Sequence, residues 1–200
     1  MNTEKNLKAQ LQSSLMEAAF ENHHTLHLTA NENLISKTSQ SAMTSSLSNR
    51  YLLNHHLSHS KAHFNEKDNF IFKNFPSLTT IFKATDEAAK KLFQAEHIEL
   101  RTLSGLHATT ITIATCTKPG DTIWCLPPDF GGHFATAQLI ESLGRNCEFL
   151  PWDKTRKNID LTKIQSATKQ PNMILFDYAD PIHPLPIKFI RDHFPQTILV

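Results

Sequence analysis

The sequence predicts an α/β fold in which a mostly parallel sheet carries helices on both faces, preceded by an N-terminal helix and an arm. From about residue 78 onward, short apolar runs alternate with amphipathic segments of helical length. Strands separated by such helices imply right-handed βαβ crossovers and therefore parallel strands. A composition of 40% hydrophobic and 20% charged residues is that of a globular protein. The 200 residues suffice for one ordinary domain or for part of a larger one.

Residues 1–77 are predicted to form an N-terminal helix and an interface arm. A helix is expected over residues 4–21, where apolar side chains recur on one face: Leu7, Leu11, Leu15, Ala18 and Ala19. A shorter helix is expected over residues 39–47. Residues 48–77 show few regular patterns but many histidines and aromatic residues. A loop of this length is usually functional or an interface element, so we expect an arm here.

Residues 78–200 are predicted to form the first part of the α/β domain, opening with a helix over residues 78–93. Strands are expected at residues 98–103, 122–126, 147–150, 173–176 and 197–200. The helices between them are expected at residues 106–116, 133–143, 161–168 and 187–193, with Asp160 capping the third. The sequence stops inside an apolar strand, which would leave an unprotected sheet edge. We therefore expect the domain to be truncated at its C-terminal end.

Charge and cysteine content narrow the range of functions. The net charge of +1 gives no electrostatic argument for binding nucleic acid or a membrane surface. No apolar run approaches the roughly 20 residues that a bilayer span needs. The three cysteines lie in apolar contexts without the spacing of a disulfide framework, which suits buried thiols in a reducing compartment. A cytoplasmic protein is expected.

Two helix starts carry residues suited to a ligand. At Ser104 and Gly105, free N–H groups and the hydroxyl would hold a phosphate or carboxylate, although the same pair also makes an ordinary helix cap. His107, one turn into that helix, would either reach the same ligand or face solvent. After the next strand comes Gly131-Gly132-His133. The imidazole of His133 would stack on a flat ligand or exchange protons, or else bond to the backbone at the helix start.

Further carboxylates and histidines could also serve a site. Asp177 and Asp180 lie at or just beyond the end of the strand at residues 173–176, although Asp180 precedes a proline and also suits a turn. His55, His59 and His63 recur every four residues and would share a helix face able to bind zinc. Neither a cysteine nor a Glu-x-x-His context supports that site. A polar loop or interface arm is preferred there, and no metal site is predicted.

Five motifs in this order resemble the serine hydroxymethyltransferase family of pyridoxal-phosphate enzymes, which is similar to the aspartate-aminotransferase-like class of fold type I. The resemblance covers about residues 28–200. The motifs are Leu28-Thr29-Ala30-Asn31-Glu32-Asn33, Ser48-Asn49-Arg50-Tyr51, Ser104-Gly105, Lys118-Pro119-Gly120-Asp121-Thr122 and Gly131-Gly132-His133. They resemble the family's Ile-Ala-Ser-Glu-Asn, Ser/Thr-Asn-Lys-Tyr, phosphate-loop Ser-Gly, Lys-Pro-Gly-Asp-Thr and Gly-Gly-His.

The resemblance implies pyridoxal 5'-phosphate as the cofactor, bound by residues 78–200. By position, Ser104 and Gly105 would hold the cofactor phosphate. His133 would stack on the pyridine ring as a catalytic residue. These roles agree with the anion-binding tendency of a helix start and with an aromatic side chain at the sheet edge.

The resemblance also implies a homodimer and an amino-acid substrate. Tyr51 would reach a cofactor phosphate, that of the neighbouring subunit. Asn31 stands where the family has a serine that helps to hold the substrate carboxylate. Asp180 falls near the family's serine that contacts the cofactor's phenolic oxygen. We therefore expect Tyr51 and Asp180 to bind the cofactor and Asn31 to bind the substrate.

Departures from the family pattern bear on the reaction. Leu53 replaces the family's catalytic glutamate, and a leucine cannot move protons. Leu106 and His107 replace a Ser-Gln pair in the phosphate loop. The resemblance places the aspartate that pairs with the pyridinium nitrogen directly after Val200, and the Schiff-base lysine further on. Activity is thus expected only of a longer chain that supplies this lysine.

The expected function is aldol and retro-aldol chemistry at the Cα–Cβ bond of a β-hydroxy amino acid. A threonine aldolase or transaldolase type of transferase or lyase is favoured over folate-dependent one-carbon transfer. One alternative is a catalytically incompetent homologue or subunit that binds a partner and possibly the cofactor. The other is an unrelated nucleotide or phosphate binder that uses Ser104 and Gly105 without pyridoxal.

Overall fold

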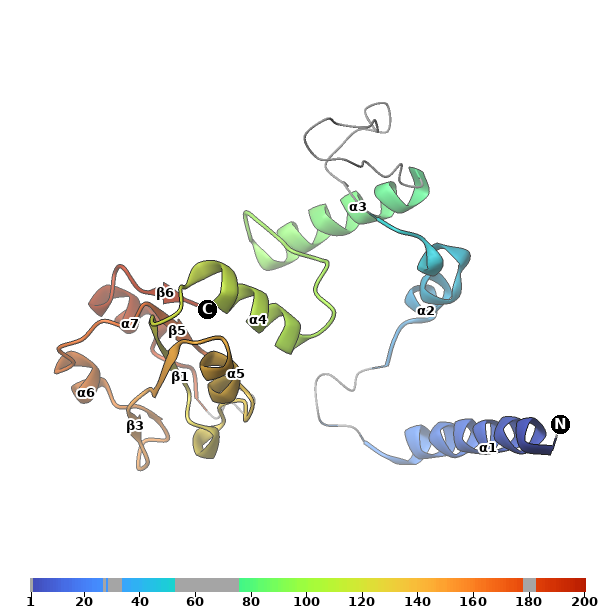
Figure 1. The fold of residues 1–200 in the computed structure, drawn as a ribbon, viewed down its shortest axis with the longest axis horizontal. Coiled ribbons are helices and arrows are strands. Elements are labelled where there is room, and N and C mark those ends of the chain that lie inside the picture. The colour runs from blue at the N-terminus through green and yellow to red at the C-terminus, as the bar shows by residue number, and fades with distance from the viewer. Residues whose placement is uncertain (1, 27, 29–33, 53–75, 178–182) are drawn as a thin grey trace. The chain divides into compact units, whose positions relative to one another are not determined.

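The computed structural model describes residues 2–26, 28, 34–52, 76–177 and 183–200 (Figure 1). The chain forms two compact units, Met1–Ile98 and Glu99–Val200. The domain division after residue 77 stays a prediction. None of the helices in the described ranges combines the length and the apolar character that a bilayer span needs.

The first unit is helical where it is described. It contains α1 (Asn2–His24), α2 (Lys37–Thr44), the short 3₁₀ helix η2 (Ser46–Asn49) and α3 (Pro76–Phe93) (Figure 1). Ser36 caps α2, because its hydroxyl accepts a hydrogen bond from the Ser39 N–H at 3.2 Å. The three helices predicted for this part of the chain are confirmed.

The second unit contains a parallel sheet of strand order β2-β1-β5-β6. Its strands are β1 (Thr122–Cys125), β2 (Asn146–Phe149), β5 (Met173–Leu175) and β6 (Ile198–Leu199). Its helices are α4 (Gly105–Cys116), α5 (Thr136–Ser142), α6 (Leu161–Gln165) and α7 (Ile187–His193). In register, Ile123 of β1 lies beside Cys147 of β2 and Met173 of β5. The predicted α/β class with a parallel sheet is confirmed.

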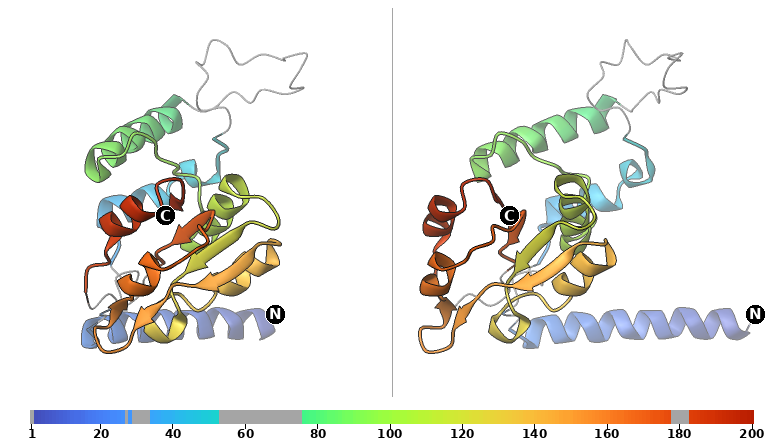
Figure 2. Two further views of the ribbon diagram at one scale, coloured as in Figure 1. Left: turned by 90° about the vertical axis from the view of Figure 1, so that its left-hand side faces the viewer. Right: turned by 60° about the vertical axis from the view of Figure 1, so that its left-hand side comes forward.

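Side chains that alternate along the strands build a core on each face of this sheet. Trp124 and Ile174 point to one face, where Ile164 of α6 and Ile190 of α7 cover them. Ile123, Cys125, Met173 and Leu175 point to the other, where Ile113 of α4 and Ile140 of α5 cover them. Both views in Figure 2 place the red α7 and the amber α5 on opposite sides of the strands.

The prediction of a strand at residues 98–103 is wrong. In the described part of the chain these residues pair with no strand, and Leu103 is 89% exposed. Arg101 instead turns back on Glu99, with its main-chain N–H 2.8 Å and its Nε 2.7 Å from one carboxylate oxygen. An alternating pattern makes a strand only where a neighbouring strand accepts it, and here the polar residues satisfy one another locally.

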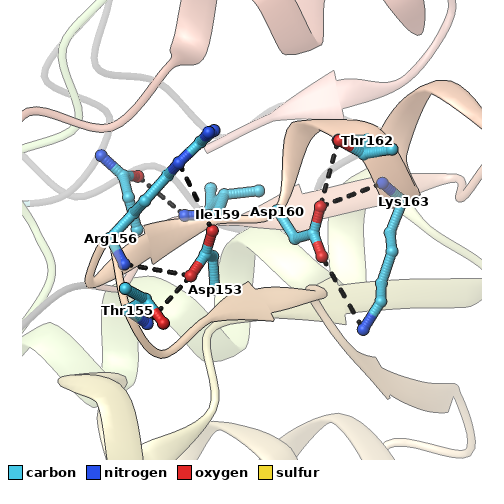
Figure 3. Close-up of polar contacts among 8 residues, drawn as sticks. Asp153, Thr155, Arg156, Ile159, Asp160, Thr162 and Lys163 are labelled. Carbon is cyan, nitrogen blue, oxygen red and sulfur yellow. Dashed lines mark hydrogen bonds and ion pairs between the residues drawn. The ribbon is translucent and has the colours of Figure 1, made fainter.

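A short hairpin after β2 was not predicted. Its strands, β3 (Trp152–Asp153) and β4 (Asn158–Ile159), are antiparallel, and Trp152 lies opposite Ile159. The Asp153 carboxylate accepts hydrogen bonds from the main-chain N–H groups of Arg156 and Thr155 at 3.0 and 2.9 Å (Figure 3). The Arg156 bond first, and the Thr155 bond with it, hold the pKa of Asp153 below its ordinary value.

The predicted cap of the helix at residues 161–168 is confirmed, although α6 ends earlier, at Gln165. One Asp160 oxygen accepts from the N–H groups of Thr162 and Lys163 at 3.1 and 3.2 Å, and the other lies 3.7 Å from Lys163 Nζ (Figure 3). The carboxylate therefore supplies partners for N–H groups that the first turn of the helix leaves open.

A buried arginine joins the end of α4 to the loop before β2. Arg145 is 9% exposed; its Nε donates to Thr117 Oγ1 at 3.0 Å and another guanidinium nitrogen donates to Thr117 O at 2.7 Å. The guanidinium also donates to the Leu143 carbonyl. A cation held by carbonyls at helix ends is favoured by the helix dipoles, so Arg145 fixes this corner of the sheet.

The cysteines are free thiols that differ in exposure. Cys125 is buried, Cys147 is half-buried, and their sulfurs lie 3.6 Å apart on neighbouring strands. Cys116 is exposed at the end of α4. The expectation of three buried thiols is therefore wrong for Cys116, because the last turn of α4 points this residue away from the core.

Candidate functional site

The carboxyl ends of β1 and β5 meet where the strand order reverses. After β1 the chain passes to β2 on one side of it, and later returns to β5 on the other. Ligands of open α/β sheets bind in the crevice at such a reversal. A pocket of about 110 Å³ lies here, lined by Gly105, Leu106, Thr109, His133 and Asp177. The start of α4, the loop after β1 and the end of β5 thus share one site.

The start of α4 presents open backbone to this pocket. Ser104 is the N-cap, and its hydroxyl accepts a hydrogen bond from the His107 N–H at 3.1 Å. His107 Nδ1 in turn accepts from the Leu103 N–H at 3.1 Å. A Cβ added at Gly105 would meet no atom within 4 Å, so a ligand can approach this backbone closely. The first N–H groups of a helix lack partners within it and attract anions.

The loop after β1 requires its glycines. Gly131 has a φ of 90°, in the left-handed region that glycine adopts without strain. A Cβ at Gly132 would lie 2.2 Å from the Leu126 carbonyl oxygen, so no other residue fits there without moving the backbone. The loop then delivers His133, whose main-chain N–H donates to the carbonyl of Asp177 at 3.0 Å. This bond ties the loop to the end of β5.

The His133 side chain lines the pocket and is half-buried. Its Nδ1 accepts a hydrogen bond from the Ala135 N–H at 3.3 Å, so the neutral ring carries its proton on Nε2. The ring stacks on exposed Phe134 with 4.7 Å between centroids. His133 was expected to open the following helix, but α5 begins at Thr136. The main-chain bond to Asp177 holds His133 in the loop instead.

Asp177 brings a carboxylate to the pocket from the end of β5. Its Oδ2 accepts a hydrogen bond from Thr136 Oγ1 at 2.6 Å, and Thr136 is only 1% exposed. Asp177 was a candidate from its place at a strand end. Thr136 was not identified, because a threonine near a helix start has no feature in sequence that marks it as the partner of a residue 41 positions away.

The structure assigns no role to three other predicted site residues, Tyr51, Asn31 and Asp180. Tyr51 belongs to the first unit and is 70% exposed. Asn31 and Asp180 lie outside the described residues, as do Leu53 and the histidine stretch: His55, His56, His59 and His63. The roles expected of Tyr51, Asn31 and Asp180 therefore stay predictions. Among the residues that the structure describes, no group of three histidines, cysteines or carboxylates could hold a metal ion.

No family model matches the chain, but the chain is similar to known proteins over most of its length. The chain is 31% identical over 184 residues to the fluorothreonine transaldolase of Streptantibioticus cattleyicolor, an alignment covering 92% of this chain and 29% of that protein. It is 27% identical over 173 residues to the serine hydroxymethyltransferase of Methanosphaera stadtmanae, covering 84% of this chain and 38% of that protein. The chain therefore spans well under half the length of these curated relatives.

The fold of the chain resembles that of a solved structure. The whole chain superposes on 46% of the crystal structure of L-threonine transaldolase from Pseudomonas fluorescens, with a TM-score of 0.76 and 23% sequence identity. A match at this score shows that the fold is shared.

Proposed function

We propose, from the premise that this chain is related over most of its length to the serine hydroxymethyltransferase-like pyridoxal-phosphate enzymes of fold type I, that the whole protein makes and breaks the Cα–Cβ bond of a β-hydroxy amino acid. The relationship confirms the family, the fold type and the cofactor that the sequence motifs predicted. The reaction, the substrate and the roles of individual residues belong to the proposal.

The observation that carries the proposal is the meeting of Gly105, His133 and Asp177 in one pocket. The open first turn of α4 suits a phosphate. The half-buried imidazole of His133 suits the face of an aromatic ring. The carboxylate of Asp177 accepts a hydrogen bond from a donor on such a ring. Anion, flat ring and donor occur together in pyridoxal phosphate, so the residues present fit this cofactor.

Each residue would then have a distinct task. The N–H groups of the α4 start and the Ser104 hydroxyl would bind the phosphate. His133 would cover one face of the ring and keep water from it, while its main-chain bond to Asp177 keeps the imidazole in place. When bound, pyridoxal phosphate supplies the electron sink that stabilises the carbanion left at Cα as the bond to Cβ breaks. The protein contributes orientation and exclusion of solvent.

A threonine aldolase or transaldolase reaction is proposed over folate-dependent transfer. Leu53 stands where the resemblance places a catalytic carboxylate, and a leucine cannot exchange a proton with a substrate hydroxyl. The relatives include two kinds of transaldolase and an alpha-methylserine aldolase as well as serine hydroxymethyltransferases, so their names support Cα–Cβ chemistry in general and Leu53 carries the choice between the reactions. We further propose a cytoplasmic homodimer in which Tyr51 reaches the partner's cofactor, Asn31 contacts the substrate carboxylate and Asp180 contacts the cofactor.

The test uses the whole protein loaded with pyridoxal phosphate. Threonine should be cleaved to glycine and acetaldehyde, and an added aldehyde should be taken up into a new β-hydroxy amino acid. Serine with tetrahydrofolate should give no comparable turnover. His133→Ala should weaken cofactor binding by about fivefold, since ring stacking contributes on the order of 1 kcal/mol. Cofactor binding without acetaldehyde release would instead support a catalytically incompetent homologue, for which Leu53 is the motivating observation.

A further inference from the structure

We propose that Thr136 is a positioning residue, which holds the Asp177 carboxylate toward the pocket and so makes the pocket select a ligand that carries a hydrogen-bond donor as well as an anion. This inference rests on the proposed function, because it concerns how the cofactor pocket distinguishes its ligand. It adds a residue, Thr136, that neither the motifs nor the comparisons assign.

The contact between the two residues has the character of a strong hydrogen bond. Thr136 Oγ1 lies 2.6 Å from Asp177 Oδ2, within the range of a hydroxyl that donates to a charged carboxylate. Thr136 is 1% exposed, so its hydroxyl has no access to bulk water and depends on a protein partner. Loss of the hydroxyl would leave one carboxylate oxygen of Asp177 without this donor.

Backbone bonds fix the position of both residues. The main-chain N–H of Thr136 donates to the His133 carbonyl at 3.2 Å, and the His133 N–H donates to the Asp177 carbonyl at 3.0 Å. Together with the side-chain bond, these contacts close a small ring through the loop after β1 and the end of β5. Asp177 is thereby held at its main chain and at one carboxylate oxygen, which leaves it little rotational freedom.

Among the described residues, the second carboxylate oxygen of Asp177 has no hydrogen-bond donor, and we assign it to the ligand. In the part of the chain that the structure describes, Asp177 Oδ1 accepts no hydrogen bond and Asp177 forms no ion pair, while its side chain lines the pocket. The residues that line the pocket include no lysine or arginine. A half-buried carboxylate without a cation calls for a donor from the ligand. The N–H groups at the start of α4, which also lines the pocket, favour an anion.

The pocket is therefore complementary to a dipolar ligand rather than to an anion alone. Pyridoxal phosphate combines a phosphate with a ring hydroxyl, which can donate to Asp177. Inorganic phosphate has only the anionic part and gains nothing from the carboxylate. The ratio of the affinities for these two ligands thus measures the contribution of Asp177. The change in this ratio when Thr136 is replaced measures how far Thr136 positions the Asp177 carboxylate.

The test compares four variants of the whole protein: Thr136→Val, Thr136→Ser, Asp177→Asn and the double variant Thr136→Val/Asp177→Asn. Binding of pyridoxal phosphate is followed by the absorbance of the cofactor, and binding of inorganic phosphate by competition. Thr136→Val should weaken cofactor binding about tenfold, the scale of one hydrogen bond to a charged group. Thr136→Ser, which keeps the hydroxyl, should stay within about twofold of the parent protein. Phosphate binding should be unchanged in the two single Thr136 variants, and should not weaken in the two variants that lose the charge of Asp177.

The double variant separates positioning from general structural support. If Thr136 acts through Asp177, cofactor binding by the double variant should be no weaker than that of Asp177→Asn. Additive losses, or a Thr136→Val protein that binds the cofactor like the parent, would overturn the inference. A parent protein that binds inorganic phosphate but not pyridoxal phosphate would overturn the proposed function itself, so the two failures are distinguishable.

Discussion

Replacing Gly132 by alanine should disrupt the packing of the His133 loop against the backbone of Leu126. The added Cβ would lie 2.2 Å from the carbonyl oxygen and 2.6 Å from the carbonyl carbon of Leu126. Both are backbone atoms of a residue that is 1% exposed, so no side-chain rotation can relieve the contact. The loop and the end of β1 must separate by about 1 Å, and overpacking of this kind costs about 1–3 kcal/mol. We expect the upper end of this range.

Urea unfolding followed by tryptophan fluorescence measures the effect. Both tryptophans belong to the second unit, and Trp124 is 7% exposed with its ring edge against Phe194 at 5.6 Å. Gly105→Ala is the matched control, because its Cβ meets no atom and alanine within a helix is favoured by about 0.5–1 kcal/mol. The urea midpoint should fall for Gly132→Ala and hold or rise for Gly105→Ala. Equal midpoints for Gly132→Ala and the parent would refute the steric argument.

The same unfolding measurement tests two other contacts of the second unit. Arg145→Leu should lower the free energy of unfolding by about 3 kcal/mol, because three buried oxygen acceptors lose their charged donor at roughly 1 kcal/mol or more each. Arg145→Lys should recover part of this loss. An Arg145→Leu protein as stable as the parent would contradict the prediction. Stability should also fall with acid, because hydrogen bonds from the hairpin turn lower the pKa of Asp153. A lowered carboxyl pKa contributes stability above its unfolded value and loses it as the pH falls through the folded value. In Asp153→Asn, stability should therefore fall less as the pH is lowered. A variant whose stability depends on pH as the parent's does would show that Asp153 does not cause the acid-induced loss.

Much of this fold is predictable because its elements depend on local patterns. The helix at residues 187–193 begins and ends where its sequence predicts, and the runs around β1 and β5 are apolar because both faces of a parallel strand are covered. The prediction at residues 98–103 failed for the converse reason. An alternating run has the period of a strand, but pairing also needs a partner, which a local pattern cannot provide. The hairpin strands, of two residues each, are too short to show any period.

The location of the site could be predicted from the sequence, but the contacts between its residues could not. Strand ends and helix starts mark the carboxyl edge of a sheet from sequence alone, and this reasoning identified Gly105, His133 and Asp177 as candidates. Which of them face one another depends on strand order. Asp177 meets His133 only because β5 lies beside β1 rather than beside β2. The Thr136–Asp177 bond follows from the same neighbourhood and has no counterpart in any motif.

The contacts that hold the walls of this pocket together are largely contacts between backbone atoms. Gly132 lies against the Leu126 carbonyl, and the His133 N–H donates to the Asp177 carbonyl, so the backbone of the pocket walls depends little on the side chains at positions 133 and 177. Side chains on such a frame can be exchanged without moving the frame. The carboxylate of Asp177 can then alter ligand choice while the backbone of the pocket stays in place. Substitutions at Asp177 should therefore change binding selectivity more than stability, whereas substitutions at Gly132 should change both.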